Sequence, residues 1–587
     1  MISPTDSAQP PSALLRLRPL VLIYAILGLA AVLRLWGIGF GLPYDGVTYD
    51  ALTIEEIQEV HRALKLGAGE YAWVFGKGGL YLILFVEYAA LYVVYWLLGW
   101  VDSGREFALQ VLQDRTTIYL MGRVTVALMG VATCYVVYRI ARRLYDVRVA
   151  LGAALIGAVS YFHAVFSAVV NVDIGATLGV WLSLLAYLRF ETTGKTRYLV
   201  GAGALAAVAI AFKMPGGIAL PLLWVALAST PRGGPASGAF VRNCVIVTVS
   251  LVVTLTAIAP EWITSIAGTI RYNFFSAIQS ANAAVQDLDL RSDIKSITVM
   301  RDEWTGGYFR HLVREYNVAL TATAVFGAIM GALRRNRWDL ILSGVVVVFI
   351  GVMSLSDRTQ PERYLLPIVP ALWILGSRGV AALGRYHRWL PGAALALVVA
   401  VPTFWLVRAA VEKSQLDTRV HAKAWIEANV PPGARILMDG MRYRFSQSPP
   451  LNPDSATVGE KVERALDEGG DFGRGVSELA LSVYQEALEK AQGPKYELVS
   501  TVHGLNVRDV SYYVDHCFDY IVTSSMVAGR YRPRAPGHRL FPESAKFYAA
   551  LVTDPRIRLV HEEAAIRWRK SGPTIKIYEV ANRCESR

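Results

Sequence analysis

Charged residues are scarce in this sequence, and their scarcity excludes an ordinary soluble protein. They make up 18% of the 587 residues, whereas soluble domains carry about 25%. The mean hydropathy is +0.36. The net charge of +12 does not indicate a nucleic-acid partner, because the basic residues cluster in short loops between apolar runs, as they do in membrane proteins. We therefore expect a multi-pass membrane protein that contacts membrane lipids and binds no nucleic acid.

Metal-binding patterns are also absent. The four cysteines have no metal-ligand spacing, and no cluster of His and Asp residues has one. We therefore predict that the protein needs no cofactor, and a divalent ion held by carboxylates is the alternative. Cys134 and Cys244 lie in or beside apolar runs and are interpreted as packing residues. Cys517 and Cys584 lie in a polar region, where a disulfide is open to them if that region is exported.

The sequence shows no cleavable signal peptide, internal repeat or low-complexity segment. Residues 1–13 are polar and rich in Pro and Ser, which predicts a disordered cytoplasmic tail. The apolar run that follows is too long for the hydrophobic part of a signal peptide, so we interpret it as an uncleaved membrane anchor.

Apolar runs recur along the first two thirds of the chain at lengths that suit membrane crossings. They cover residues 19–40, 79–101, 118–140, 149–170, 172–190, 198–212, 215–229, 242–262, 315–333, 338–355, 364–382 and 389–411.

Basic clusters between these runs decide the predicted topology. Arg16 and Arg18 place the N-terminus in the cytoplasm. If every run crossed, the later basic clusters would fall on the outer side, whereas leaving out the run 79–101 returns all of them to the cytoplasm. We therefore predict about eleven crossings, with 79–101 lying along or dipping into the outer leaflet. An intramembrane acid is costly, and Glu87 at the centre of this run favours the same interpretation.

Three regions follow from this topology. Residues 14–411 form a polytopic helical membrane domain, with a first outer loop at 41–117 and a long outer loop at 263–313. Residues 412–587 have ordinary soluble composition and alternate helical and extended patterns, which predicts a small α/β domain outside the membrane. The expected elements are helices over 420–430, 457–490 and 543–552, and strands over Arg435–Met438, Tyr520–Thr523 and Thr574–Val580.

Acidic residues at the outer edge of the membrane are the first candidates for chemistry. Residues 49–64 have apolar positions at helical spacing, which predicts an amphipathic helix at the interface with Asp50, Glu55 and Glu56 at its start and on its wet side. A solvated charged face is the alternative there. Asp173 lies at an outer hinge between two apolar runs, where it also suits a helix N-cap. Because carboxylates at this depth are costly unless they are used or paired, both positions are candidate site residues.

Basic residues collect on the same predicted side. They are Arg34, Lys77, Arg123, Lys213 and Arg363. Any one of them is explained by a long side chain that reaches the lipid headgroups. Several of them on one face predict a site for an anionic lipid phosphate.

The order of these motifs resembles the GT-C glycosyltransferases of the protein O-mannosyltransferase and aminoarabinose-transferase type, glycosyltransferase family 39. The resemblance covers roughly residues 20–410. It rests on Gly41-Leu42-Pro43-Tyr44, the acidic pair before Ala63-Leu64-Lys65-Leu66-Gly67, Phe75-Gly76-Lys77-Gly78-Gly79, Gly122-Arg123, Ser160-Tyr161-Phe162-His163 before Asp173, Lys213, and Arg363-Tyr364-Leu365-Leu366-Pro367. The C-terminal region resembles the extracytoplasmic domain of some bacterial members.

The resemblance implies a GT-C fold with outer juxtamembrane helices. It also implies an inverting transfer of a sugar from a polyprenyl-phosphate donor to an acceptor outside the cytoplasmic membrane, the acceptor being a protein, a lipid or a polysaccharide. Glu55 stands at the family's Asp position and Glu56 at its Glu position, a departure that leaves Asp50 as an alternative base. Asp173 matches the second acidic position.

The same resemblance gives roles to the basic residues. Lys77 matches the Lys that contacts the donor phosphate, although Gly78 replaces the family's Pro after it. Arg363 matches the Arg of the last outer turn. Arg123 and Lys213 are further phosphate-binding candidates, and Arg34 and His163 are supporting residues.

Two other functions stay open at this stage. One is a non-catalytic lipid-binding or assembly subunit on the same fold, which the Glu at the Asp position favours. The other is a transporter of a lipid-linked or anionic solute, although charges at the outer edge and the lack of visible repeats are not typical of transporters.

Overall fold

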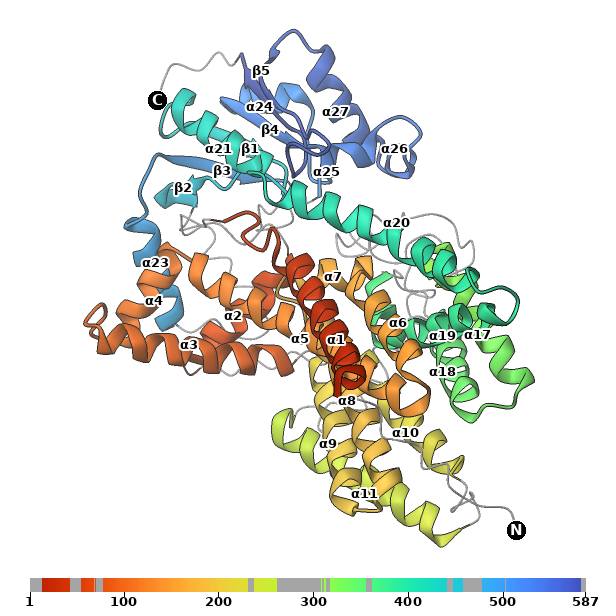
Figure 1. Cartoon of the computed structure of the whole chain (residues 1–587). Helices are drawn as coiled ribbons and strands as arrows, with labels where there is room; N and C mark the ends of the chain where they lie inside the picture. The colour runs from red at the N-terminus through yellow and green to blue at the C-terminus, as the bar shows by residue number, and fades with distance from the viewer. Residues whose placement is uncertain are drawn as a thin grey trace, which may run out of the picture.

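The structure is a computed structural model of the chain. It describes residues 13–42, 54–67, 69, 78–230, 237–260, 308, 311–312, 317–354, 362–440, 447–457, 478–501 and 503–581. A helical assembly is formed by the residues up to 413, and a mixed α/β unit by those after 417 (Figure 1).

The helical assembly contains the predicted apolar runs as helices. Its elements are α1 (Ala13–Leu35), α2 (Ile54–Gly67), α3 (Gly79–Leu97), α4 (Gly104–Gln113), α5 (Thr116–Leu144), α6 (Val147–Ala158), α7 (Tyr161–Ser167), α8 (Val172–Thr193), α9 (Thr196–Phe212), η1 (Met214–Ile218), α10 (Ala219–Ala228), α11 (Gly238–Ile258), α17 (Val318–Leu333), α18 (Arg337–Ser354), η3 (Glu362–Ile368), α19 (Val369–Ala382), η4 (Leu383–Arg385) and α20 (Leu390–Lys413).

Length and composition confirm a multi-pass membrane protein. Within the described residues, 7 helices are long and apolar enough to cross a membrane, or 8 if the bent pair α6–α7 counts as one span, and shorter apolar helices lie at Pro19–Leu35, Thr196–Phe212, Met214–Ala228 and Val318–Leu333. The exact number of crossings stays a prediction. Helix α3 passes the same criterion, so length and composition do not set it apart, and its predicted position along the outer leaflet also stays a prediction.

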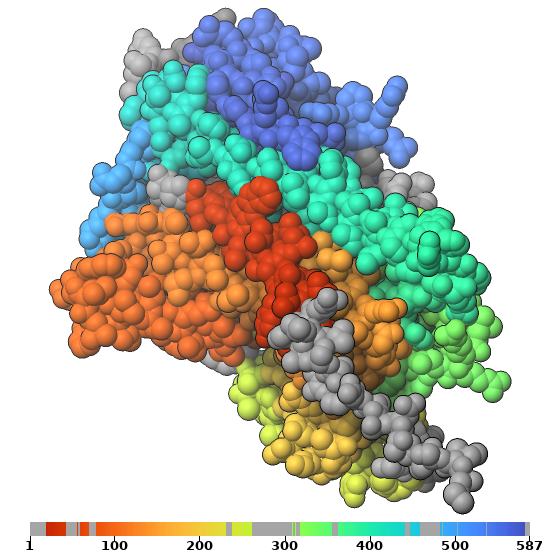
Figure 2. All heavy atoms as spheres, viewed as in Figure 1, coloured from red at the N-terminus to blue at the C-terminus, as the bar shows by residue number. Residues whose placement is uncertain are grey.

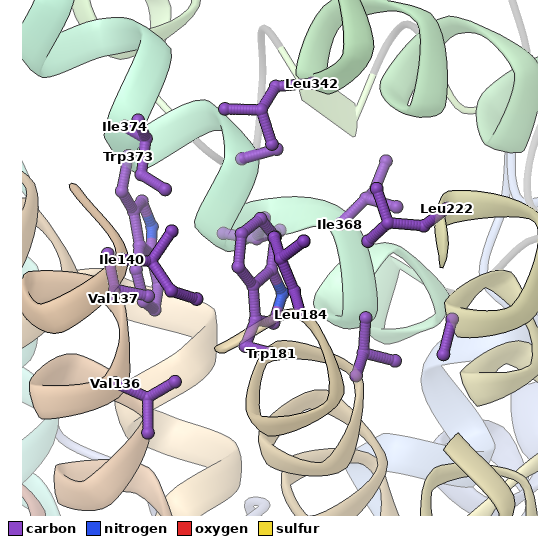
Figure 3. Close-up of a cluster of buried hydrophobic side chains, with 14 of the residues drawn as sticks. Val136, Val137, Ile140, Trp181, Leu184, Leu222, Leu342, Ile368, Trp373 and Ile374 are labelled. Carbon is purple, nitrogen blue, oxygen red and sulfur yellow. The ribbon is translucent and has the colours of Figure 1, made fainter. Parts of the chain in front are cut away.

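Large indoles and small residues together form the core of the helical assembly. Trp181 of α8 and Trp373 of α19 are fully buried among aliphatic side chains of α5, α10 and α18 (Figure 3). Helices α17 and α19 pack with their backbones almost in contact. A Cβ on Gly379 of α19 would overlap the backbone oxygen of Thr323 of α17, so this crossing requires glycine. Small residues at such crossings are typical of membrane helices, whose association depends on close packing.

Helix α6 ends inside the assembly instead of continuing into α7. The apolar run 149–170 breaks after Ala158, and the two helices are bent by 58°. A broken helix leaves backbone carbonyls unpaired where no water reaches them, so the chain must supply a donor there.

The C-terminal unit combines helices with a β-sheet, as predicted. Its strands are β1 (Arg435–Met438), β2 (Asn452–Pro453), β3 (Lys495–Ser500), β4 (Tyr520–Ser524), β5 (Ile557–Glu563) and β6 (Ile575–Val580). Their order is β2-β3-β1-β4-β6-β5. Strands β2, β3, β1 and β4 run parallel to one another, and β6 runs antiparallel to both of its neighbours, β4 and β5. The helices are α21 (Thr418–Asn429), α23 (Glu478–Glu489), α24 (Val510–Asp515), α25 (Ser525–Ala528), η5 (Gly529–Tyr531), α26 (Pro536–Leu540) and α27 (Pro542–Thr553).

Successive side chains of the central strands point to opposite faces of the sheet, and this explains why helices cover both faces. In β1, Ile436 and Met438 pack with the core under α21, while Leu437 between them packs with the core under α24 and α27. Successive strand residues point to opposite faces, so an apolar strand needs a helical layer on each side.

The segment 568–574, between β5 and β6, holds this unit on the membrane assembly. The backbone N–H of Trp568 donates to Glu412 at the end of α20 (3.1 Å), and its ring packs edge-on against Phe404. Thr418 donates through its hydroxyl to the carbonyl of Pro573 (2.5 Å). Ser525, directly after β4, donates to the carbonyl of Thr574 (2.9 Å). The carboxyl end of β4 therefore lies on the side that faces the membrane helices.

A second connection joins α23 to the outer helix α4. The guanidinium of Arg105 donates to Glu486 at 2.7 Å, and Leu109 and Leu112 pack against Ala487 and Leu488. Cys517 of the same unit is disulfide-bonded, to a residue outside the described part, while Cys134 and Cys244 are free.

Asp439 and His503 are buried together at the carboxyl edge of the sheet. Asp439 accepts hydrogen bonds from Tyr548 (2.5 Å), Thr501 (3.2 Å) and the backbone N–H of Ser524 (2.9 Å). Burial raises the pKa of Asp439 to about 6, although these three donors act against the rise. Burial, helped by the guanidinium of Arg530, lowers the pKa of His503 to about 4.

We predict that these two groups have opposite effects on stability between about pH 4 and pH 6.5. The raised pKa of Asp439 means that stability is lost as the pH rises through this window, whereas the lowered pKa of His503 means that stability is gained. Each effect is on the order of 2 kcal/mol, so the two largely cancel. His503→Asn should therefore unfold more readily at pH 6.5 than at pH 4.5 in chemical denaturation of the full chain. Equal stability of that variant at both pH values contradicts the prediction.

Candidate functional site

The first turn of α8 places a carboxylate at the end of the helical assembly that lies toward the C-terminal unit. Asn171 caps this helix by accepting the backbone N–H of Asp173 at 2.7 Å. The Asp173 side chain is nearly fully buried, and its Oδ1 accepts from the ammonium of Lys213 at 2.5 Å. Its Oδ2 is buried and has no hydrogen-bond partner among the described residues. One carboxylate oxygen is therefore held by a cation while the other remains able to accept a proton or hydrogen bond.

Lys213 owes its position to the end of α9. The helix stops at Phe212, and the Met-Pro-Gly-Gly sequence that follows turns the chain into η1. The ammonium lies 4.4 Å from the ring centroid of Tyr364, so this cation contacts an aromatic face as well as the carboxylate. The predicted site residues Asp173 and Lys213 are thus in direct contact.

The turn η3 brings Arg363 and Tyr364 to the same place. It packs on α8, where the indole N–H of Trp181 donates to the carbonyl of Pro367 at 2.9 Å. Arg363 is half-buried. An apolar helix core therefore positions a polar turn beside Asp173.

Tyr308 completes this group from the long outer loop. It is almost fully buried. Burial raises the pKa of Tyr308, the neighbouring Tyr364 and Glu362 raise it further, and Arg363 lowers it. The phenol therefore stays protonated and can donate a hydrogen bond.

A second ion pair lies beside this group, between α2 and α5. Arg123 donates through Nε (2.8 Å) and a terminal nitrogen (2.9 Å) to the two oxygens of Glu56, and both side chains are fully buried. Its other terminal nitrogen donates to the carbonyls of Ile38 (2.8 Å) and Phe40 (2.7 Å). Glu56 also accepts the backbone N–H of Val170 at 2.9 Å. Arg123 was predicted to bind the donor phosphate; that role stays a prediction, and these contacts join three segments of the chain.

Arg34 and His163 meet at the break between α6 and α7. The Arg34 guanidinium donates to the carbonyls of Ala158 (3.0 Å) and Gly157 (3.1 Å), which end α6, and lies 2.9 Å from Nδ1 of His163. The same guanidinium also donates to Ala30 within α1 (3.0 Å). Arg34 thus supplies the donor that the broken helix requires.

Other predicted site residues lie outside the described part of the chain. These are Lys77, Asp50 and the side chain of Glu55. The backbone next to Lys77 is described, and Gly78 donates to the carbonyl of Ala211 near the end of α9 (2.6 Å). The predicted roles of Glu55, Lys77 and Asp50 stay predictions.

The sequence did not point to Lys413. It ends α20, two residues beyond the last predicted crossing. In the structure it lies close enough to Arg123 and Glu56 to interact with both electrostatically. A basic residue in the last turn of the last membrane helix was the only available indication.

The arrangement suits chemistry between an acid and a phosphate at this end of the helical assembly. A carboxylate with an open oxygen can orient or deprotonate a hydroxyl. Cations fixed beside it can stabilise a departing anion without reorganising. Within the described residues, no group of three or more His, Cys, Asp or Glu side chains could hold a metal ion, and independence from metal stays a prediction.

Comparison with known proteins matches part of the chain to one family. The family described as dolichyl-phosphate-mannose-protein mannosyltransferase matches residues 118–263, a range that contains Arg123, Asp173 and Lys213. The match confirms the resemblance to the protein O-mannosyltransferase type over that range. Among curated proteins, none matches the sequence.

Solved structures with a similar arrangement are distant in sequence. ArnT from Cupriavidus metallidurans in the apo state is 14% identical over 97% of this chain and 99% of that chain, with a TM-score of 0.48. The oligosaccharyltransferase of Archaeoglobus fulgidus tethered to an acceptor peptide is 13% identical over 91% and 72%, with a TM-score of 0.45. The Pmt1–Pmt2 complex of S. cerevisiae bound to the sugar donor is 19% identical over 45% and 36%, with a TM-score of 0.28.

We predict that Arg34→Ala lowers the free energy of unfolding by about 3 kcal/mol, because two buried carbonyls lose their donor. Thermal unfolding in detergent measures the loss. Arg148→Ala is the control, since Arg148 lies on α6 and is exposed. Equal melting temperatures for the two variants show that Arg34 does not support the helix break.

We predict that Glu56→Gln lowers the free energy of unfolding more, by about 3–5 kcal/mol, because this change leaves Arg123 buried without its counter-charge. The same unfolding assay compares it with Glu106→Gln, an exposed acid on the nearby helix α4. An unchanged melting temperature for Glu56→Gln contradicts the bracing role of the pair.

Proposed function

We propose that the protein is an inverting glycosyltransferase that moves a sugar from a polyprenyl-phosphate donor to an acceptor at the outer face of the cytoplasmic membrane. The observation that carries this proposal is the Asp173–Lys213 pair, buried at 2.5 Å with one carboxylate oxygen open. It lies inside the range that matches the mannosyltransferase family.

The proposed reaction is a single displacement at the anomeric carbon. The acceptor hydroxyl oxygen forms the new bond as the bond from carbon to the phosphate oxygen breaks, and the electron pair leaves with the phosphate. A carboxylate takes the hydroxyl proton as general base. Glu55 is the proposed base, and Asp173 orients the acceptor and stabilises positive charge at the anomeric carbon.

The leaving phosphate requires cations but no proton. Lys213 lies at the carboxylate and against Tyr364, and Arg363 lies in the adjoining turn. With Lys77 these are the proposed phosphate-binding residues. Arg123 is left out of this set because it already donates to Glu56 and to two carbonyls, so it positions the outer loop instead.

The proposed orientation places the N-terminus in the cytoplasm and the C-terminal unit outside. The basic loops support this orientation. The disulfide at Cys517 supports it independently, because such bonds persist in oxidising compartments. The reaction is proposed to need no metal, since the cations of the chain serve the phosphate.

We predict that the purified protein releases free polyprenyl phosphate from one member of a panel of polyprenyl-phosphate sugars, and that Asp173→Asn and Glu55→Gln each lower the turnover by at least about 100-fold. The control is Asp102→Asn, which removes an exposed acid. Each variant is first compared with wild type in melting temperature, so that loss of turnover is separated from loss of fold.

The outcome names the sugar as well as the activity. Release that survives both substitutions contradicts the site. No release from any donor by folded protein contradicts the transferase and favours a lipid-binding or assembly subunit. Movement of a solute across vesicles without any donor favours a transporter.

A further inference from the structure

A cavity of about 260 Å³ lies where the membrane assembly meets the C-terminal unit. One wall is the turn that follows α1, and the other is the end of α20 with the residues that lead into α21. Figure 2 shows the end of α1 lying against α20 beneath the C-terminal unit. The lining includes Gly37, Gly39, Gly41, Lys413 and Gln415. This cavity is separate from the Asp173–Lys213 pair and is given no part in the proposed transfer.

In the turn after α1, every second backbone N–H donates a hydrogen bond to a carbonyl earlier in the chain. Ile38, Phe40 and Leu42 donate to the carbonyls of Leu35, Gly37 and Gly39. The glycine amides between them, at Gly37, Gly39 and Gly41, donate to no acceptor among the described residues. Unpaired backbone amides are obligatory donors, so these three glycines can still donate to an acceptor that the described residues do not supply.

Gly37 shows that the turn is shaped around α20. Its φ is +77°, and a Cβ there would meet the carbonyl oxygen of Ala410 and the Cβ of Lys413, each at 3.0 Å. Only glycine fits this backbone conformation and this approach. The stem of Lys413 is therefore fixed against the turn, with its ammonium 6.0 Å from the ring centroid of Phe40.

The charges around the cavity leave Lys413 in excess. Glu56 is paired with Arg123, Glu412 with Arg408 (2.9 Å), and Asp417 with Arg419 (2.7 Å). Among the described residues Lys413 has no acidic partner within ion-pair distance. A lysine without an ion-pair partner among the described residues, beside amides that meet no acceptor there, indicates a site for an added anion.

We propose that this cavity binds a phosphate group presented at the outer membrane surface. The ammonium of Lys413 and the glycine amides match the charge and the acceptor oxygens of a phosphate. The volume of about 260 Å³ suits a headgroup, and it is smaller than the roughly 300–1,000 Å³ of drug-sized ligand sites. Helices α1 and α20 both end here, which places the cavity at headgroup depth. A polyprenyl phosphate and an anionic phospholipid both supply this chemistry.

The test uses the full chain in phosphatidylcholine nanodiscs, with geranyl phosphate as the probe and native mass spectrometry to count bound molecules. Two variants remove the site in different ways. Lys413→Gln removes the cation. Gly39→Leu fills the cavity and keeps the charge, and a Cβ at Gly39 would meet nothing within 4 Å. The control is Lys546→Gln, on an exposed face of α27.

Wild type should bind two molecules of geranyl phosphate. Lys413→Gln and Gly39→Leu should each weaken one of these by at least about tenfold, while Lys213→Gln weakens the other and the control changes neither. Binding by both cavity variants that equals wild type overturns the proposal and leaves the proposed transferase site intact. Binding that depends on Lys413 and not on Lys213 supports the cavity while it contradicts the proposed donor site.

A second series identifies the source of the phosphate. If phosphatidylglycerol in the nanodisc displaces only the molecule that depends on Lys413, the site holds a phospholipid headgroup. If phosphatidylglycerol has no effect, the site holds the phosphate of a prenyl chain. Both results support a phosphate site at Lys413.

Discussion

The ion pair between Glu56 and Arg123 holds together the outer part of the membrane assembly. Arg123 comes from α5, Glu56 from the first outer loop, and the same guanidinium binds the carbonyls of Ile38 and Phe40 after α1. Glu56 in turn accepts the amide of Val170, in the turn that precedes α8. A buried pair is costly to break, because the remaining charge has no water. The cap of α8, with Asp173, follows directly from a turn that this pair fixes.

The same physical constraint explains the positions of the other buried charges. Hydrocarbon offers no hydrogen bonds, so each charge or broken helix end must find its partner within the protein. Arg34 compensates the end of α6, and Lys213 compensates Asp173. Buried polar groups at these helix ends are therefore organised in pairs. A buried polar group there that has no partner among the described residues is a candidate for binding a ligand.

Much of the fold was predictable because its patterns are local. Apolar runs gave the membrane helices, and short apolar strands gave β1 at Arg435–Met438 and most of β4 and β6. Strands β3 and β5 were not predicted. In β3 the charged residues Lys495 and Glu497 alternate with buried Tyr496 and Leu498, which leaves few apolar residues in a short segment. Strand β5 lies at the edge of the sheet and has a register shift between Leu559 and His561. The break after Ala158 was also missed. The run around it is continuously apolar, and the donor that permits the break is Arg34, far away in sequence.

The sequence allowed the candidate residues of the site to be named, but it did not show which of them form ion pairs with one another. Sequence order showed that acids and bases collect at the outer face, and Asp173 and Lys213 do lie together. It did not show that Glu56 neutralises Arg123, because such a contact joins helices that are distant along the chain. Lys413 was overlooked because nothing local distinguishes it from a lysine that ends a helix.

Pairing also separates the roles of the outer carboxylates. Both oxygens of Glu56 are occupied by Arg123, and one also accepts the amide of Val170, so it has little capacity left for a substrate. Asp173 keeps one oxygen open, while its other oxygen accepts from the ammonium of Lys213. In the proposed transfer this paired carboxylate orients the acceptor and stabilises positive charge at the anomeric carbon. Proton removal is then assigned to another carboxylate. Glu55, at the family's acidic position and next to Glu56 in α2, is where the chain offers one.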